Sequence, residues 1–152
     1  MLPEVVIVMG VTGVGKSTLG AALAAALGVP FREGDSFHPP ENLCKMRAGM
    51  ALQDADRWPW LNLLGLAIVA RRQLMGAVAA CSALKRSYRD RLRAVIGEPL
   101  LFVFLQAWQG HYMPATLLDS QFATLELPGA DERAIVLPAD GSIHAIIERL
   151  RA

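Results

Sequence analysis

The sequence has few cysteines, no excess of either charge and no apolar run long enough to cross a membrane. Its 15 lysines and arginines against 14 acidic residues give a formal net charge of +1, so no strong field attracts it to nucleic acid or to a membrane surface. Cys44 and Cys81 lack metal-ligand spacing, which favours reduced thiols in a cytoplasmic protein. The longest apolar stretch, residues 60–70, is too short to span a bilayer, so we expect a buried helix there.

From the sequence we expect neither a targeting segment nor a second domain. Glu4 precedes only a short apolar run, which does not resemble a signal peptide. With 152 residues, of which 53% are apolar, the chain can form one globular domain over residues 1–152. The basic cluster at residues 85–93 is most simply the solvated face of a helix, so we predict neither a nucleic acid nor a membrane as partner.

Strand-like apolar runs alternate with helical patterns along the chain. The patterns predict strands at residues 4–9, 29–35, 77–82, 100–106 and 134–138. They predict helices at residues 16–27, 40–48, 54–75, 84–96, 115–126 and 142–152. Strands separated by helices are typical of an α/β fold in which right-handed crossovers join parallel strands. We therefore expect a three-layer structure, a five-stranded parallel sheet with helices on both faces.

The first strand leads into the sequence GVTGVGKS at residues 10–17, which fits the phosphate-binding pattern G-x-x-x-x-G-K-[ST]. Backbone N–H groups of such a loop bind phosphate oxygens, and the following helix adds the positive end of its dipole. Lys16 is expected to reach the β- and γ-phosphates and Ser17 to bind Mg²⁺. A strand before and a helix after the loop favour nucleotide binding over a ligand-free turn. The predicted nucleotide-binding residues are Gly10, Val11, Thr12, Gly13, Val14, Gly15, Lys16, Ser17 and Thr18.

A pair of carboxylates follows the second predicted strand. Glu33 and Asp35 are separated by one residue, and the end of a parallel strand lies beside the ligand crevice of an α/β sheet. One carboxylate is expected to hold Mg²⁺, directly or through water, and the other to accept the proton of an attacking hydroxyl. The guanine-reading motif N-K-x-D is absent, so the pattern favours a small-molecule kinase over a regulatory GTPase.

Six blocks of sequence resemble the gluconokinases, small P-loop kinases related to the shikimate kinases. They are MGVTGVGKST, EGDSFHPPENLCKM, LQDADRWPWL, CSALKRSYRDRLR, GHYMPATLLDSQF and LELPGADE. The resemblance implies a P-loop kinase fold with a mobile lid, and phosphorylation of D-gluconate to 6-phosphogluconate with ATP and Mg²⁺. It also implies a cytoplasmic location and a possible homodimer. It places the pocket for the nucleotide base at residues 127–131.

The resemblance also assigns roles to single residues. Lys16, Asp35 and Arg57 become the catalytic residues, with Asp35 as the base and Ser17 as the metal ligand. Arg57 should point at the substrate carboxylate or at the transferring phosphoryl group. The implied substrate-binding residues are Asp35, His38, Arg57, Lys85, Arg89 and His111.

Simpler interpretations of some of these residues stay open. Arg57 can instead pair with Asp54 on its own helix, and His38 can be a polar residue at the start of a helix. For Trp58 and Trp60, packing is favoured over stacking on a sugar.

The lid region, around residues 107–116, departs from the family pattern. Gluconokinases carry an arginine-bearing helix after the fourth strand, whereas here only Trp108 and Gln109 stand between Ala107 and Gly110. A lid arginine can contribute about 10³–10⁵ in rate. Either the chain truly lacks the segment, which would leave a nucleotide binder with poor catalysis, or the sequence omits a lid segment of the protein. Since the other motifs are intact, the second explanation is favoured.

Three functions are therefore weighed. The first is an ATP:gluconate phosphotransferase, and the second is a P-loop kinase of another small hydroxy acid such as shikimate. The third is a nucleotide-binding protein with an impaired lid.

Overall fold

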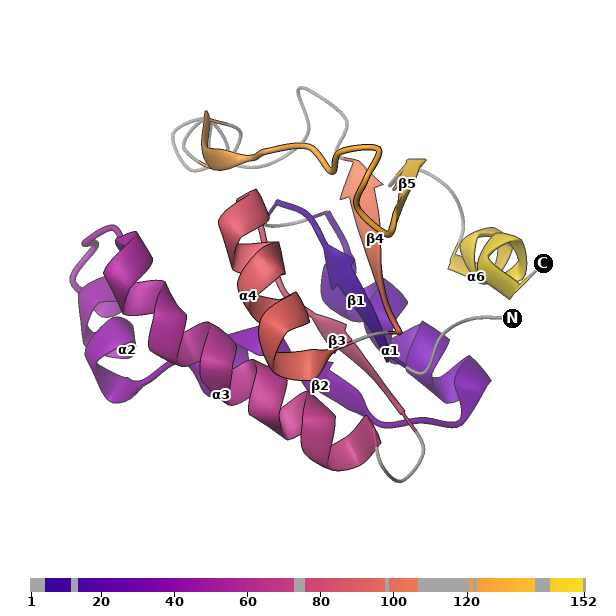
Figure 1. Cartoon of the computed structure of the whole chain (residues 1–152), viewed down its shortest axis with the longest axis horizontal. Coiled ribbons are helices and arrows are strands. Elements are labelled where there is room, and N and C mark those ends of the chain that lie inside the picture. Colours follow the sequence, from indigo (N-terminus) through magenta and orange to yellow (C-terminus); the bar gives the residue numbers. More distant parts are fainter. Residues whose placement is uncertain are drawn as a thin grey trace.

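The computed structural model describes residues 5–11, 14–72, 76–97, 99–106, 121, 123–138 and 143–151. Its strands are β1 (Val5–Met9), β2 (Phe31–Glu33), β3 (Ala77–Ala80), β4 (Leu100–Gln106) and β5 (Ala134–Pro138). Its helices are α1 (Lys16–Leu27), the 3₁₀ helix η1 (Gly34–Phe37), α2 (Pro40–Arg47), α3 (Asp54–Arg72), α4 (Arg86–Ile96) and α6 (Ile143–Arg151). Figure 1 shows their arrangement.

The strands form one five-stranded sheet in the order β2-β3-β1-β4-β5. All four pairings are parallel, and the central strand β1 lies between β3 and β4, with Ile7 level with Ala79 and with Phe102. Every residue of β1 is buried, as expected for an apolar strand with both faces covered. The predicted parallel α/β sheet is confirmed.

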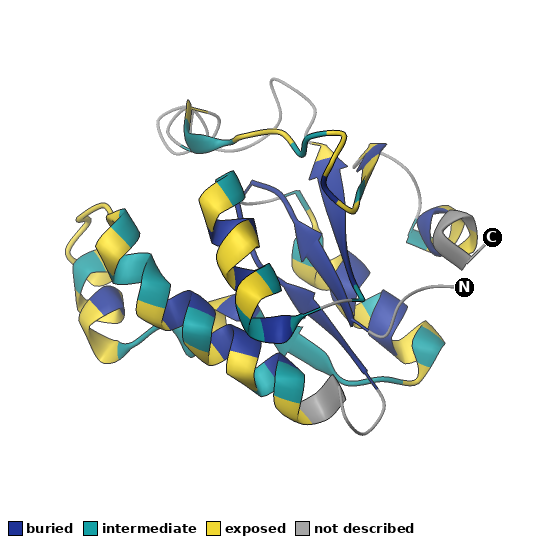
Figure 2. Ribbon diagram, in the orientation of Figure 1, coloured by how far each residue is buried: buried dark blue, intermediate teal, exposed yellow. Residues whose placement is uncertain are grey.

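Alternate residues of β1, β3 and β4 enter two separate cores, because successive side chains of a strand point to opposite faces. On one face Ile7 and Phe102 pack with side chains of α3 and α4, such as Leu64 and Leu92. On the other face the core is made with α1 and α6; its members include Val6, Val8, Leu23, Val103 and Ile147. In Figure 2 the buried colour follows β1, β3 and β4 and the helix faces turned toward them.

The predicted element boundaries differ from the observed ones mainly at the ends. The second strand stops at Glu33 and continues as η1, where the pattern predicts a strand to residue 35. The lid region at 107–116 lies outside the described residues. Of the predicted helix at 115–126, residues 121, 123 and 124 are helical, residues 125 and 126 are not, and the rest lie outside the described residues. Within the described ranges, no helix is both long and apolar enough to cross a membrane.

Candidate active site

A cavity of about 580 Å³ opens at the carboxyl ends of β1, β2 and β3. Its walls come from the start of α1, from the segment between β2 and α2, from α3 and from the residues after β3. Binding sites of parallel α/β sheets lie at this edge. Among its lining residues are Lys16, Ser17, Glu33, Asp35, His38, Arg57 and Trp60. Predicted residues that are far apart in the sequence therefore share one cavity.

The start of α1 has the geometry of an anion-binding helix end. Gly15 precedes the helix with φ of 100° and ψ of 23°, a left-handed conformation, and no side chain caps the helix. Glycine adopts such a conformation without steric cost. The first N–H groups of a helix lack partners within the helix, so those of α1 are available to phosphate oxygens. Thr12 and Gly13, predicted to contact the nucleotide, lie outside the described residues.

The ammonium group of Lys16 lies at this helix end and donates a hydrogen bond to the carbonyl oxygen of Val11, at 3.0 Å. Burial lowers the pKa of Lys16, while the nearby carboxylate of Asp35 opposes that change. The carbonyl oxygen is an uncharged partner. The partly desolvated ammonium group of Lys16 can therefore exchange it for a negatively charged phosphate oxygen, with a gain in electrostatic energy.

The structure separates the two carboxylates that the sequence leaves equivalent. The hydroxyl group of Ser17 donates a hydrogen bond to the carboxylate of Glu33, whereas Asp35 is exposed and lines the cavity. Ser17 and Glu33 are oxygen ligands of the type that Mg²⁺ prefers. No group of three or more His, Cys, Asp or Glu side chains suited to a metal occurs in the described part of the chain. Such a pair fits a Mg²⁺ ion that takes its remaining ligands from phosphates and water.

Gly34 brings the two carboxylates close to the end of β3. Its backbone is buried, and a Cβ atom at this position would overlap the carbonyl oxygen of Ala80. Only glycine permits this approach. β2 therefore ends at Glu33, directly before Gly34. Asp35, in the 3₁₀ helix η1, lines the cavity.

His38 lies in the cavity wall and stacks on Trp60, with ring centroids 4.2 Å apart and ring planes inclined by 18°. Burial lowers the pKa of His38; Asp35 opposes this effect and Arg57 adds to it. Burial therefore favours the neutral form of the ring. Trp60 is itself anchored by a 2.7 Å hydrogen bond from its indole N–H to the carbonyl oxygen of Gly34. It is 2% exposed, in line with the favoured packing role.

Arg57 also lines the cavity, and two hydrogen bonds fix one of its terminal nitrogens, Nη1. This nitrogen donates to the carbonyl oxygen of Leu52 at 2.8 Å and to the hydroxyl oxygen of Tyr88 at 3.1 Å. The alternative partner of Arg57, Asp54, accepts hydrogen bonds from Tyr88 at 2.6 Å and from Lys85 at 3.1 Å. Arg57 is thus positioned beside Asp35 and His38 as the sequence predicts, and Tyr88 is a support that the sequence analysis did not identify.

Lys85 is not brought to this cavity. Its ammonium group pairs with Asp54, and it lines a neighbouring cavity of about 480 Å³ together with Tyr88 and Thr124. Arg57 borders both cavities. A substrate contact by Lys85 would therefore have to come from the neighbouring cavity or follow the loss of its pair with Asp54.

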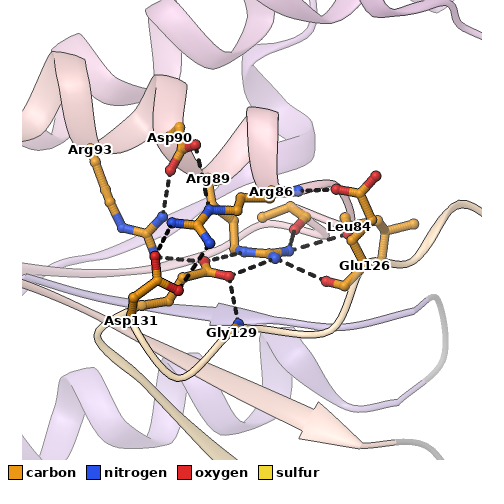
Figure 3. Close-up of polar contacts among 10 residues, drawn as sticks. Leu84, Arg86, Arg89, Asp90, Arg93, Glu126, Gly129 and Asp131 are labelled. Atoms are coloured by element: carbon orange, nitrogen blue, oxygen red, sulfur yellow. Dashed lines mark hydrogen bonds and ion pairs between the residues drawn. The ribbon is translucent and has the colours of Figure 1, made fainter.

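Arg89 departs from the expected role in substrate binding. It is fully buried and pairs with Glu132, with an Nε to Oε1 distance of 2.7 Å. Its other nitrogens donate to the carbonyl oxygens of Ala83, Leu84 and Glu126. Figure 3 shows that this guanidinium joins α4 to the segment before β5, residues 126–132. The motif around Arg89 resembles a binding motif, but the tertiary fold uses this arginine as an internal crosslink.

The remaining predicted residue, His111, lies outside the described residues, as does the segment around Trp108. Trp58 packs edge-on against Tyr88, with ring centroids 5.7 Å apart, and it contacts the core between the sheet and α3. This agrees with the favoured packing interpretation of that tryptophan.

Comparison with known proteins identifies close relatives. No family model matches the chain. A gluconokinase from Gluconobacter oxydans (strain 621H) is 46% identical over 164 residues, covering 97% of this chain and 89% of the relative. The crystal structure of a gluconokinase from Sinorhizobium meliloti 1021 is similar with a TM-score of 0.84 and 43% identity, covering 95% of this chain and 87% of that chain. A shikimate kinase from Aquifex aeolicus shares the fold, with a TM-score of 0.60 and 12% identity over 97% of this chain and 93% of its own.

The length of the first alignment bears on the lid. It runs over 164 positions, whereas this chain has 152 residues, so the Gluconobacter relative carries residues that this chain lacks. The alignment length does not locate them, and residues 107–120 lie outside the described ranges. The two explanations of the short lid therefore both stand as predictions.

Proposed function

The chain belongs to the gluconokinase family, and we propose that it transfers the γ-phosphoryl group of ATP to D-gluconate, forming 6-phosphogluconate and ADP. The observation that carries the proposal is the shared cavity. The start of α1 with Lys16 lines this cavity together with Asp35, His38 and Arg57. A sugar acid needs a cation for its carboxylate and hydrogen-bonding groups for its hydroxyls, and these residues supply both.

In the proposed reaction Asp35 accepts the proton of the O6 hydroxyl group of gluconate. The O6 atom then bonds to the γ-phosphorus as the bond to the β-phosphate oxygen breaks, and ADP leaves. The N–H groups at the start of α1 and the ammonium group of Lys16 stabilise the charge on the transferring group. Arg57, held by Leu52 and Tyr88, orients the carboxylate of gluconate or the phosphoryl group.

We further propose Mg²⁺ as the metal ion, held on the protein side by Ser17 and Glu33. When bound there, the ion would neutralise negative charge on the transferring phosphate groups. We propose the cytoplasm as the compartment, since Cys44 and Cys81 are free thiols. A homodimer stays a prediction that light scattering can check.

The competing functions make different predictions for one assay. We expect ADP release from the full-length protein with ATP, Mg²⁺ and gluconate, and much less with shikimate and with other sugar acids. Turnover of shikimate in preference to gluconate would replace the proposed acceptor. ATP binding without turnover of any acid would favour a nucleotide-binding protein with an impaired lid. Lys16→Ala is the control for the phosphate contact, and near-normal activity of that variant would contradict it.

A further inference from the structure

The side chain of Asn42 contacts a ring nitrogen of His38. Asn42 is buried at 3% exposure and lies on α2, four residues after His38. Its amide nitrogen is 2.8 Å from the carbonyl oxygen of Asp56 and 3.2 Å from the Nδ1 atom of His38. A carbonyl oxygen can only accept a hydrogen bond. The group facing Asp56 must therefore be the NH₂ group of the amide.

That assignment leaves one possibility for the imidazole ring. The NH₂ group has two hydrogens and no acceptor site, so its second hydrogen points to Nδ1 of His38, and Nδ1 must be unprotonated. A neutral imidazole with an unprotonated Nδ1 carries its proton on Nε2. Burial favours the neutral ring and lowers the pKa of His38, in agreement with this tautomer.

Because Asn42 occupies Nδ1, Nε2 is the ring nitrogen left for a ligand in the cavity. His38 and Trp60 line the cavity, whereas Asn42 does not, so the ring edge opposite Nδ1 is the one available to a ligand. Within the described residues no hydrogen bond to Nε2 occurs. Stacking on Trp60 at 4.2 Å restricts the ring plane, and Asn42 restricts rotation within that plane.

We propose that Asn42 is a positioning residue, which holds His38 as the Nε2–H tautomer so that His38 donates a hydrogen bond to an oxygen of the acceptor substrate. The inference deepens the proposed function and rests on it only for the identity of the acceptor. An N–H group that is already oriented favours acceptor substrates that have an oxygen atom beside Nε2 over substrates that lack one. Neither the role of Asn42 nor the tautomer of His38 can be predicted from the sequence, because the amide of Asn42 is oriented by a tertiary contact with α3.

The direct test is a long-range ¹H–¹⁵N spectrum of the free full-length protein at pH 7.5. The chain has three histidines, and the signals that disappear in His38→Gln belong to His38. We expect the pattern of the Nε2–H tautomer in the wild type. At pH 7.5 Asn42→Asp should convert the ring to the Nδ1–H tautomer, because a carboxylate accepts where the amide donates, and Nε2 then carries no proton. An Nδ1–H pattern in the wild type would overturn the inference whatever the substrate is, and the only variant that this outcome requires is His38→Gln, for the assignment.

Kinetics test the role of the proton. Asn42→Asp should raise the KM for gluconate about 10-fold, the effect of one lost hydrogen bond, and leave the KM for ATP unchanged. In His38→Gln the side-chain amide can place a donor near the Nε2 position, so this variant should keep more affinity for gluconate than His38→Asn. Equal losses in the two His38 variants, or a tautomer change in Asn42→Asp without a change in KM, would overturn the substrate contact. A wild type inactive on gluconate would refute the proposed function, and the tautomer spectrum would still decide the role of Asn42.

Discussion

Two carboxylates separated by one residue receive different surroundings in this fold. Glu33 accepts a hydrogen bond from Ser17, and Asp35 is exposed to the cavity that also holds His38 and Arg57. The difference arises at Gly34, whose close approach to Ala80 turns the chain from strand into 3₁₀ helix. Metal binding and proton transfer are therefore expected of different residues.

Asparagine at position 35 tests the proton acceptor. Asp35→Asn should lower kcat about 10²–10⁴-fold, since an amide cannot act as the base, with little change in the KM for ATP. Glu33→Gln is the matched variant and should raise the Mg²⁺ concentration needed for half-maximal rate. Both quantities come from initial rates of ADP release at varied ATP and Mg²⁺. If Asp35→Asn instead changed only the Mg²⁺ requirement, Asp35 would be the metal-side residue.

At the scale of elements, a group of charges joins α4 to the segment before β5. Glu132 accepts hydrogen bonds from Arg89, from Arg93 and from the backbone N–H of Gly129. Figure 3 shows these three donors, Arg89 and Arg93 on α4 and Gly129 in the segment before β5. The side chains of Arg89 and Glu132 are 0% and 1% exposed. The segment contains residues 127–131, where the family resemblance places the base pocket, so its position depends on a contact remote from the phosphate loop.

Removing one partner of the Arg89–Glu132 pair should lower the free energy of unfolding. Arg89→Met leaves the carboxylate of Glu132 buried without its main partner, and we expect a loss of about 3–5 kcal/mol in the free energy of unfolding. Arg86→Gln is the control, because it removes a solvent-exposed pair with Asp131 and should change stability little. Urea unfolding followed by circular dichroism measures both. Equal effects of the two substitutions would contradict the structural role of the buried pair.

The same group makes stability dependent on acid. Burial alone would raise the pKa of Glu132, but hydrogen bonds from Arg89, Gly129 and Arg93 outweigh it and lower the pKa from 4.5 to about 2. A lowered folded-state pKa contributes stability that is fully present above pH 4.5 and is lost as the pH falls toward 2.

Urea unfolding between pH 6 and pH 2.5 checks this dependence. Glu132→Gln should be less stable at pH 6 and should lose less stability on acidification than the wild type. A parallel decline of the two proteins would show that other carboxylates cause the acid dependence.

At the scale of the whole molecule, stability and metal binding are expected to be independent. Two apolar cores on opposite faces of the sheet hold the fold, and the described residues include no group of three metal-binding side chains. EDTA should therefore abolish ADP release without lowering the melting temperature by more than a degree or so, because a ligand-free site adds no linkage energy. A large fall in melting temperature on chelation would reveal a structural metal.

The phosphate loop and the sheet could be predicted from the sequence because both depend on local patterns. Residues 10–17 carry their own conformational requirements, and a buried parallel strand needs a continuous apolar run such as Val5–Met9. The cavity could be predicted only in part. Asp35, His38 and Arg57 were expected at strand ends and helix starts, and the structure brings them together.

The sequence by itself determined the parallel α/β sheet, the phosphate-binding loop and the family, since each depends on residue order within a short segment or block. Only the tertiary structure decided which charged side chains reach the cavity. Lys85 turns to Asp54 and Arg89 to Glu132, although both follow β3 in a motif that resembles a binding site. The physical reason is that a cation pairs with the nearest carboxylate in space, and Asp54 and Glu132 reach these positions only when α3 and the segment before β5 pack against α4.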